Sequence, residues 1–111
     1  MIVYLASPYS APTEQERILR FNEACRAAAK LMRDGLTVFC PISHSHPIAM
    51  HMPSKYSMDH EFWMRQDLPI LVKCARMYVL RLSGWEQSKG VAKELEFAVN
   101  QGIPVIYIDP E

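Results

Sequence analysis

Four short apolar segments, separated by long amphipathic ones, constrain the fold of this chain more than any other feature. Each is five or six residues long and rich in β-branched, aliphatic and aromatic residues, which is typical of a buried strand. The segments are IVYLA (2–6), LTVFC (36–40), MYVLRL (77–82) and PVIYI (104–108). Each interval between them contains a stretch with helical periodicity. The sequence therefore predicts a β-α-β-α-β-α-β order and a parallel sheet that helices cover on both faces.

The predicted fold is a doubly wound α/β domain, flavodoxin- or Rossmann-like, with about four strands in the order 2-1-3-4. A chain of 111 residues, half of them hydrophobic, is long enough for one core, so we expect a single domain over residues 1–111. The twelve basic and twelve acidic residues balance each other. This balance argues against a nucleic acid polymer or an anionic membrane as the partner.

The cysteines and the apolar runs predict a location. Cys25, Cys40 and Cys74 are odd in number, widely spaced and without a CxxC pair. This pattern favours reduced thiols. No segment resembles a signal peptide, and no apolar run approaches the roughly 20 residues of a transmembrane helix. We therefore expect a cytoplasmic domain.

Three helices are predicted between the strands. The first begins after an N-cap at Thr13 and ends at Gly35. Its expected inner stripe is Ile18, Phe21, Cys25, Ala28 and Met32. The second covers about 60–74, where Pro69 interrupts or kinks it, and the third covers 89–101. The stretch 41–59 has no clear helical or strand pattern.

The predicted loops point to one edge of the sheet. Connections that leave strands are longer and more polar than those that enter them, namely SPYS (7–10), PISHSHP (41–47) and SGWEQS (83–88). Ligands of such sheets bind at the carboxyl ends of the strands, where these connections lie. Candidate ligand-binding residues at this edge are Ser7, His44, His46 and Trp85. Trp85 could stack on a planar ligand or simply close the core.

Two glutamates in the last helix have different predicted settings. A helical wheel places Val91, Leu95, Ala98 and Val99 on the packed arc. Glu94 lies at the border of that arc and Glu96 about 160° away from it. We therefore expect Glu94 to be turned inward and Glu96 to face water.

The start of the same helix predicts an anion site. Ser88 is a natural N-cap, and Gly90 removes a side chain where a ligand could approach backbone N–H groups. The alternative is that Ser88 only caps the helix and Gly90 only permits close packing.

The chain resembles the nucleoside 2-deoxyribosyltransferase-like superfamily, which includes the 2′-deoxynucleoside 5′-monophosphate N-glycosidases. The resemblance covers nearly the whole chain, and it is closest to a small uncharacterised bacterial and phage branch. It rests on YLASPYS (4–10), QDLPIL (66–71) and GWEQSKGVAKELEFA followed by GIPVI (84–106). The most specific pattern is S-x-G-x-x-x-E-L after a strand, followed by G-x-P.

The resemblance implies a role for each matched residue. Glu94 falls on the family's nucleophile and Ser88 on its phosphate-binding serine. Tyr4 falls on the tyrosine that contacts the nucleophile, and Asp67 on an aspartate that assists catalysis. Such residue types suit the cleavage of an N-glycosidic bond, which develops positive charge at the sugar C1′. Asp67 could donate a proton to the base or orient the sugar, and Tyr4 could equally be a core residue. We expect burial to raise the pKa of Glu94 and a hydrogen bond from Tyr4 to lower it again, which would keep the carboxylate ionised.

The sequence also departs from the family. Arg76 stands where an acidic residue often begins the third strand, and the fifth strand of longer members has no counterpart before Glu111. We therefore expect hydrolysis more than base exchange. A non-catalytic nucleotide-binding module and a deoxyribosyltransferase are the alternatives.

His44 and His46 form an H-x-H pair without an accompanying ligand set, so no metal or cofactor is expected. The expected partners are a nucleoside or nucleotide and, because the chain is rich in hydrophobic residues, a second copy in a homodimer or higher oligomer.

Overall fold

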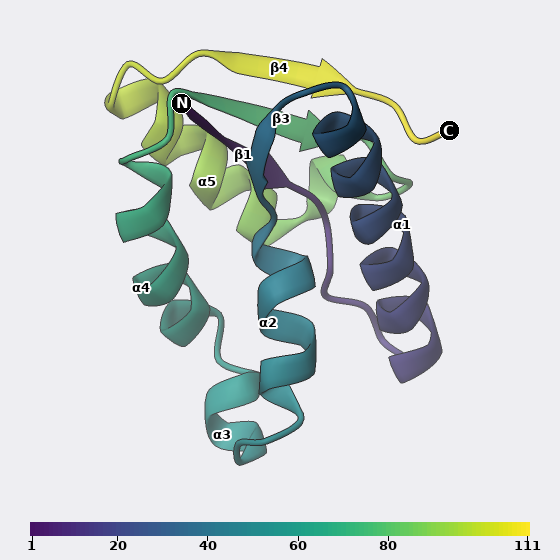
Figure 1. The fold of residues 1–111 in the computed structure, drawn as a ribbon. Helices are drawn as coiled ribbons and strands as arrows, with labels where there is room; N and C mark the ends of the chain where they lie inside the picture. Colours follow the sequence, from purple (N-terminus) through teal and green to yellow (C-terminus); the bar gives the residue numbers. More distant parts are fainter.

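The sheet and its order agree with the sequence. The computed structural model describes all residues, 1–111 (Figure 1). Its four strands are all parallel and lie in the order β2-β1-β3-β4, which confirms the doubly wound α/β prediction. The strands are β1 (Ile2–Ala6), β2 (Thr37–Phe39), β3 (Arg76–Leu80) and β4 (Val105–Ile108).

The helices agree with the sequence except in the segment between β2 and α4. The helices are α1 (Glu14–Arg33), α2 (Pro41–Ala49), α3 (Ser54–Ser57), α4 (His60–Leu71), the 3₁₀ turn η1 (Trp85–Gln87) and α5 (Lys89–Asn100). α4 contains Pro69 without interruption and ends two residues later. No helix combines the length and the apolar character that crossing a membrane requires.

The segment PISHSHP, which was predicted to be a polar loop, is most of α2. This prediction was wrong because the local signals of the segment are weak. Proline at the first helical position loses no hydrogen bond, since the N–H groups of the first turn have no partner in the helix. Contacts with α1 and β1, which the sequence pattern does not reveal, then hold the short helix. Figure 1 shows α2 and α3 extending away from the sheet, between α1 and α4.

Alternation along the strands separates two cores. Tyr4 and Ala6 of β1 face α4 and α5, whereas Leu5 faces α1. In β3, Met77 and Val79 face the same way as Tyr4. Successive side chains of a strand point to opposite faces. The alternation of side chains along β1 therefore directs the Tyr4 side chain towards α5.

The buried stripe of α1 differs from the predicted one. Its fully buried residues are Ala24, Ala28 and Leu31, while Ile18 and Met32 are exposed. The helix is rotated so that these residues, two of them alanines, face the core. The predicted cap is confirmed, because Thr13 Oγ1 accepts a hydrogen bond from the Glu16 amide at 3.1 Å.

One arginine joins two loops at the carboxyl edge of the sheet. Arg20 donates to the Ser10 carbonyl at 2.6 Å and to the Ser83 carbonyl at 3.2 Å. Next to it, Gly84 has a φ of 88°, and a Cβ there would lie 2.9 Å from the Arg20 guanidinium. Only glycine meets both requirements at low energy. The loops after β1 and β3 are thus held in fixed positions.

Candidate active site

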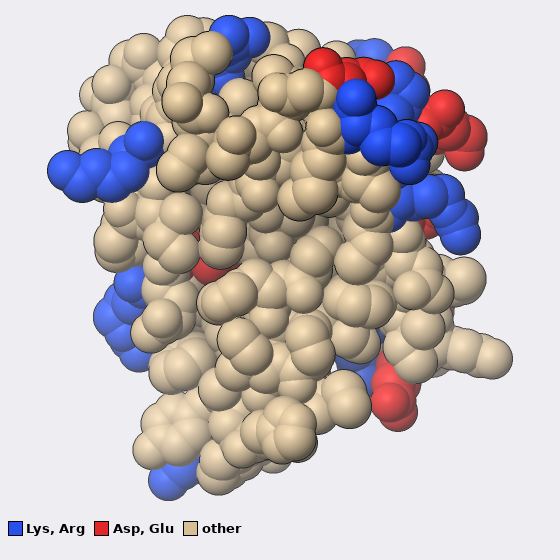
Figure 2. Space-filling view, viewed as in Figure 1, with Lys and Arg blue, Asp and Glu red and all other residues tan.

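A cavity of about 780 Å³ opens at the carboxyl edge of the sheet. Its walls are the loop after β1, the start of α1, the helices α2, α3 and α4, and the first turns of α5. This volume is within the usual range of small-molecule sites, roughly 300–1,000 Å³. Figure 2 shows that charged side chains on the viewed face gather mainly at its periphery, whereas the surface over α2 is formed by uncharged residues.

Glu94 lies in the wall of this cavity and is buried, with only 4% of its surface exposed. α5 is rotated relative to the predicted wheel, so that Val91, Glu94 and Ala98 form its buried stripe while Val99 is 69% exposed. The carboxylate is thus at the centre of the packed face and not at its border. Glu96 is exposed.

The hydroxyl of Tyr4 donates a hydrogen bond to Glu94 Oε2. Tyr4 is itself completely buried. Its pKa is raised well above the ordinary value by burial and by the neighbouring Glu94 and Asp67 carboxyl groups. The phenol therefore stays protonated and acts as a donor.

Asp67 lines the same cavity from α4 and is only 7% exposed. Burial raises the pKa of its carboxyl group to about 7. A carboxyl group on a helix surface would have no reason to be desolvated in this way. Two buried acids from different helices therefore meet one cavity, and the Asp67 carboxyl group disfavours the ionisation of Glu94.

The protonation of Glu94 differs from the expectation. We expected the Tyr4 hydrogen bond to offset burial and keep the carboxylate ionised. Instead, burial raises the pKa of Glu94 to about 8, and the Asp67 charge adds to this, while the hydrogen bond from Tyr4 lowers it only in part. Burial prevails because the whole carboxyl group is removed from water while only one donor replaces it.

The first turn of α5 presents backbone N–H groups at the same cavity. Ser88 Oγ accepts a hydrogen bond from the Val91 amide at 3.2 Å, as expected for the N-cap. The amides of Lys89 and Gly90 have no hydrogen-bond partner in the protein. A Cβ on Gly90 would have Ser88 Oγ, 3.8 Å away, as its nearest neighbour. Close packing therefore does not require this glycine, and the space above it is open.

A model of one protein family matches residues 1–109 of the chain. Its description is "Domain of unknown function (DUF1937)". The chain belongs to this family. No curated protein sequence matches it significantly. The function of this DUF1937 domain therefore has to be inferred from the chemistry of its cavity.

Three of the predicted binding residues of the DUF1937 domain lie outside the cavity wall. Ser7 is buried and its hydroxyl donates weakly to the Pro8 carbonyl at 3.4 Å. His44 is exposed, with its ring centroid 5.5 Å from that of Phe39. Trp85 packs on Tyr107 at 5.6 Å between ring centroids. The Trp85 contact corresponds to its structural alternative, in which the side chain closes the core.

His46 does line the cavity of the DUF1937 domain, together with residues that the sequence reasoning missed. Among these are Tyr9, Arg17, His60 and Trp63. Tyr9 could have been suspected, because it follows the first strand at the ligand edge. The others come from helices whose orientation was not predictable. No group of three or more His, Cys, Asp or Glu side chains has a spacing suited to a metal ion.

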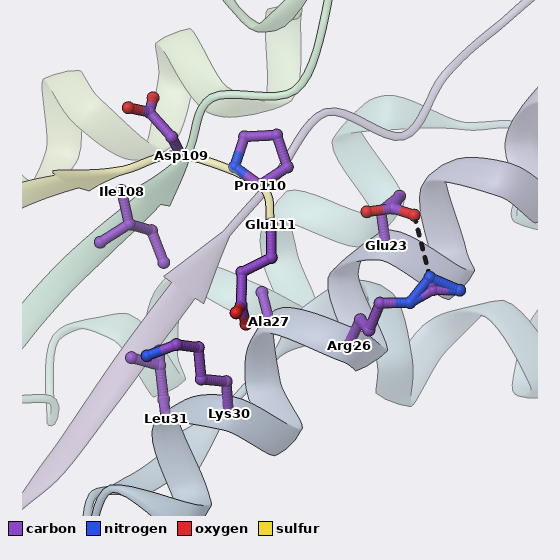
Figure 3. A pocket seen from close by; sticks show the side chains of 9 residues that line it. All are labelled: Glu23, Arg26, Ala27, Lys30, Leu31, Ile108, Asp109, Pro110 and Glu111. Atoms are coloured by element: carbon purple, nitrogen blue, oxygen red, sulfur yellow. Dashed lines mark hydrogen bonds and ion pairs between the residues drawn. The ribbon is translucent and has the colours of Figure 1, made fainter.

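A second cavity of the DUF1937 domain is much smaller, about 120 Å³. It lies between α1 and the end of β4 (Figure 3). Figure 3 shows the Lys30 and Glu111 side chains at this hollow and an ion pair between Glu23 and Arg26. It contains no buried acid, so the larger cavity is the candidate active site.

Proposed function

We propose that this chain is an N-glycosidase that hydrolyses the bond between the base and the sugar of a nucleoside or a (deoxy)nucleoside 5′-monophosphate. The observation that carries the proposal is the meeting of two buried carboxyl groups, Glu94 and Asp67, at one cavity whose wall also contains a helix N-terminus. The resemblance to the nucleoside 2-deoxyribosyltransferase-like superfamily assigns the same residues to this chemistry.

The reaction needs one carboxylate and a second acid. As the bond between C1′ and the base nitrogen breaks, positive charge develops on C1′ and the ring oxygen. Ionised Glu94 would stabilise this charge or form a glycosyl ester that water then hydrolyses. Tyr4 holds one oxygen of Glu94, and the other would be left to contact the sugar. Asp67 would protonate the departing base or orient the sugar.

The 5′ end of the substrate, opposite its base, would lie at the start of α5. Free N–H groups and the positive end of the helix dipole favour an anion, and a 5′-phosphate is the anion that a nucleotide supplies. The open space above Gly90 lets such a group approach the backbone. Lys89 and Arg17 also line the cavity and supply positive charge.

The direct test is incubation of the purified chain with a panel of ribonucleosides, deoxyribonucleosides and their 5′-monophosphates. Free base is measured by chromatography. The wild-type chain should release base from at least one member of the panel. A Glu94→Gln variant prepared in parallel should release none, which excludes a contaminating enzyme. Adding a second, free base to the mixture tests exchange, because a transferase would form a new nucleoside from it.

A non-catalytic nucleotide-binding module is the second candidate, and one observation favours it. With a pKa raised to about 8, most Glu94 side chains are protonated at neutral pH in the empty site. A protonated carboxyl group is a poor nucleophile but a good hydrogen-bond donor. A binder would retain its affinity for the nucleotide in Glu94→Gln, since the amide can also donate. An N-glycosidase would lose turnover.

We further expect a homodimer or a higher homo-oligomer in the cytoplasm. Met50 and Met58 at the cavity are 74% and 69% exposed, and Tyr56 beside them is 43% exposed. A second copy that covers these side chains would remove apolar surface from water. Light scattering at micromolar concentration measures the mass directly. A monomer at all concentrations would contradict the expected dimer without touching the proposed reaction.

A further inference from the structure

The His46 ring is held on two sides by aromatic neighbours. Phe21 of α1 stacks on it, with 4.2 Å between ring centroids and 23° between ring planes. Tyr9 meets it edge-on at 5.6 Å and 80°. Because the ring also lines the cavity, its orientation towards a ligand is fixed before any ligand binds.

The hydroxyl of Tyr9 lies 2.6 Å from His46 Nδ1, which is a hydrogen-bond distance. Two assignments of the proton are possible. If Nδ1 carried the proton, it would donate to the Tyr9 oxygen, and the Tyr9 O–H would be left without an acceptor in the protein. If Tyr9 donates to Nδ1, the Tyr9 O–H and Nδ1 are both satisfied, and the imidazole proton is on Nε2, whose N–H has no partner in the protein and is left for a ligand.

The segment that carries Tyr9 is itself fixed. Arg17 donates to the Ala11 carbonyl at 2.9 Å, and Arg20 donates to the Ser10 carbonyl at 2.6 Å. Both arginines belong to α1, so the loop after β1 is tied to the helix that also supplies Phe21. The Tyr9 hydroxyl is therefore positioned by the fold and not by a ligand.

We propose that His46 donates a hydrogen bond from Nε2 to the base of the substrate, and that Tyr9 is a positioning residue that fixes this tautomer. The inference rests on the N-glycosidase proposed above. With the sugar C1′ at Glu94 and the phosphate at the start of α5, the base would face the walls that the other helices form, and His46 of α2 belongs to these walls. Every common nucleobase has a ring nitrogen or a carbonyl oxygen that accepts a hydrogen bond.

The donor would act most strongly during bond cleavage. When the bond to C1′ breaks, its electron pair stays on the base nitrogen and spreads over the acceptor atoms of the base. A fixed N–H group that points at one of these atoms stabilises the developing negative charge. The bond from Tyr9 polarises the imidazole and strengthens its N–H donor. Water supplies the hydroxyl group to C1′ and, overall, the proton to the base.

The first measurement is the tautomer of His46 in the intact chain. With ¹⁵N-labelled imidazole rings and a pH at which histidine is neutral, the proton-nitrogen correlation pattern distinguishes the two tautomers. We expect the Nε2–H form in the wild type and a mixture in Tyr9→Phe. Tyr56→Phe is the matched control, because this exposed tyrosine of α3 does not line the cavity. An Nδ1–H tautomer in the wild type would overturn the proposal.

The second measurement is base release. Removing a hydrogen-bond donor to a developing anion costs about 10²–10³ in kcat, so His46→Ala should fall in this range. His46→Gln keeps an amide donor and should recover part of the loss. Tyr9→Phe should lower kcat about tenfold with little change in KM.

If the wild type releases base and these variants match it, His46 has no such role. If the wild type releases none, the proposed reaction fails. Titration of the labelled chain with free nucleobases then decides, because a shift of the Nε2–H signal supports the contact and no shift refutes it.

Discussion

The Tyr4 hydroxyl hydrogen-bonds to the Glu94 carboxyl group across 90 residues of sequence. The contact joins the central strand β1 to α5, the helix that packs on the same face of the sheet as Tyr4. Both groups are removed from water, so each is the other's main polar partner. A tyrosine that served only packing would need no carboxyl group opposite it, and this pairing at a cavity favours a chemical role.

Glu94→Gln should abolish base release and leave the fold intact. The amide has the same shape and still accepts the Tyr4 hydrogen bond, but it can neither carry the charge nor attack C1′. We expect kcat to fall by at least about 10³, in line with the loss of a nucleophile that its neighbours cannot replace. Glu96→Gln makes the same chemical change two residues away on the exposed side of α5 and should leave the rate unchanged. Near-parental release of base by Glu94→Gln would rule out the mechanism.

The rate should depend on pH in a direction that the Glu94 carboxyl group sets. Its pKa is raised to about 8, so kcat/KM should rise tenfold per pH unit up to about that value, if the ionised form attacks. In Tyr4→Phe the hydrogen bond that lowers this pKa is lost, so the rising limb should move to higher pH. An unchanged limb would mean that Glu94 does not control it.

The same profile distinguishes the two roles of Asp67, whose pKa is raised to about 7. If Asp67 must donate a proton to the base, activity should fall again at high pH and give a bell-shaped curve. If it orients the sugar as a carboxylate, activity should stay on a plateau. The two acids are coupled, so the fitted values belong to the pair. Repeating the profile with Asp67→Asn identifies the limb that this residue controls.

Stability should fall as the pH rises from about 5 to about 8. The pKa of Glu94 is raised from an ordinary value of 4.5 to about 8, so the folded chain holds a proton that the unfolded chain has lost. The free energy of unfolding therefore decreases across this range. The proton on Glu94 stabilises the fold in full only below the pKa that this carboxyl group has in the unfolded chain. Glu94→Gln should make the curve less steep, with the slope that remains due to Asp67, whose pKa is also raised, and it should be the more stable form at about pH 9, by up to a few kcal/mol. Urea unfolding at a series of pH values measures this, with Glu96→Gln as the control.

Much of this arrangement was predictable, because strands and long helices carry strong periodic signals. The four apolar runs predicted the sheet. Side chains along a strand alternate between its two faces with a period of two residues, and this alternation directs Tyr4 to one face. The inward direction of Glu94 followed from the wheel of α5. The wheel still misplaced the centre of the buried face, because Val99 is apolar yet exposed. A wheel cannot tell which apolar residue is left in water.

The cavity wall formed by α2 and α3 could not be predicted. α2 is only nine residues long and contains Pro47 and two histidines, so neither propensity nor periodicity identifies it. Its position depends on tertiary contacts with α1. For this reason His46 was recognised only as a residue near the ligand edge, and its contact with Tyr9 came from the fold.

Ser88→Ala should weaken phosphate binding beyond its effect on stability. The hydroxyl caps α5 by accepting the Val91 amide at 3.2 Å, and its loss should cost about 1 kcal/mol. Its remaining O–H can donate to a phosphate, so KM should rise more for a 5′-monophosphate than for the free nucleoside. Thr13→Ala removes the corresponding cap of α1, and because the Thr13 side chain does not line the cavity, this variant should lower stability alone. Equal rises in KM for both substrates would remove Ser88 from the phosphate role.

Gly90→Ala should make the protein more stable and a poorer enzyme. Position 90 lies in the first turn of α5, and the nearest atom to an added Cβ is Ser88 Oγ at 3.8 Å, an ordinary contact. The methyl group should therefore stabilise the helix by up to about 1 kcal/mol. It would also occupy the space through which a phosphate reaches the free amides of Lys89 and Gly90. KM for a 5′-monophosphate should therefore rise about tenfold or more, which corresponds to roughly 1.4 kcal/mol or more of lost binding.

The matched control is Ala92→Gly on the exposed side of the same turn, which should lower stability by a similar amount and leave KM unchanged. Urea unfolding and steady-state kinetics on both variants test the pair, and an unchanged KM in Gly90→Ala would show that no ligand approaches this backbone.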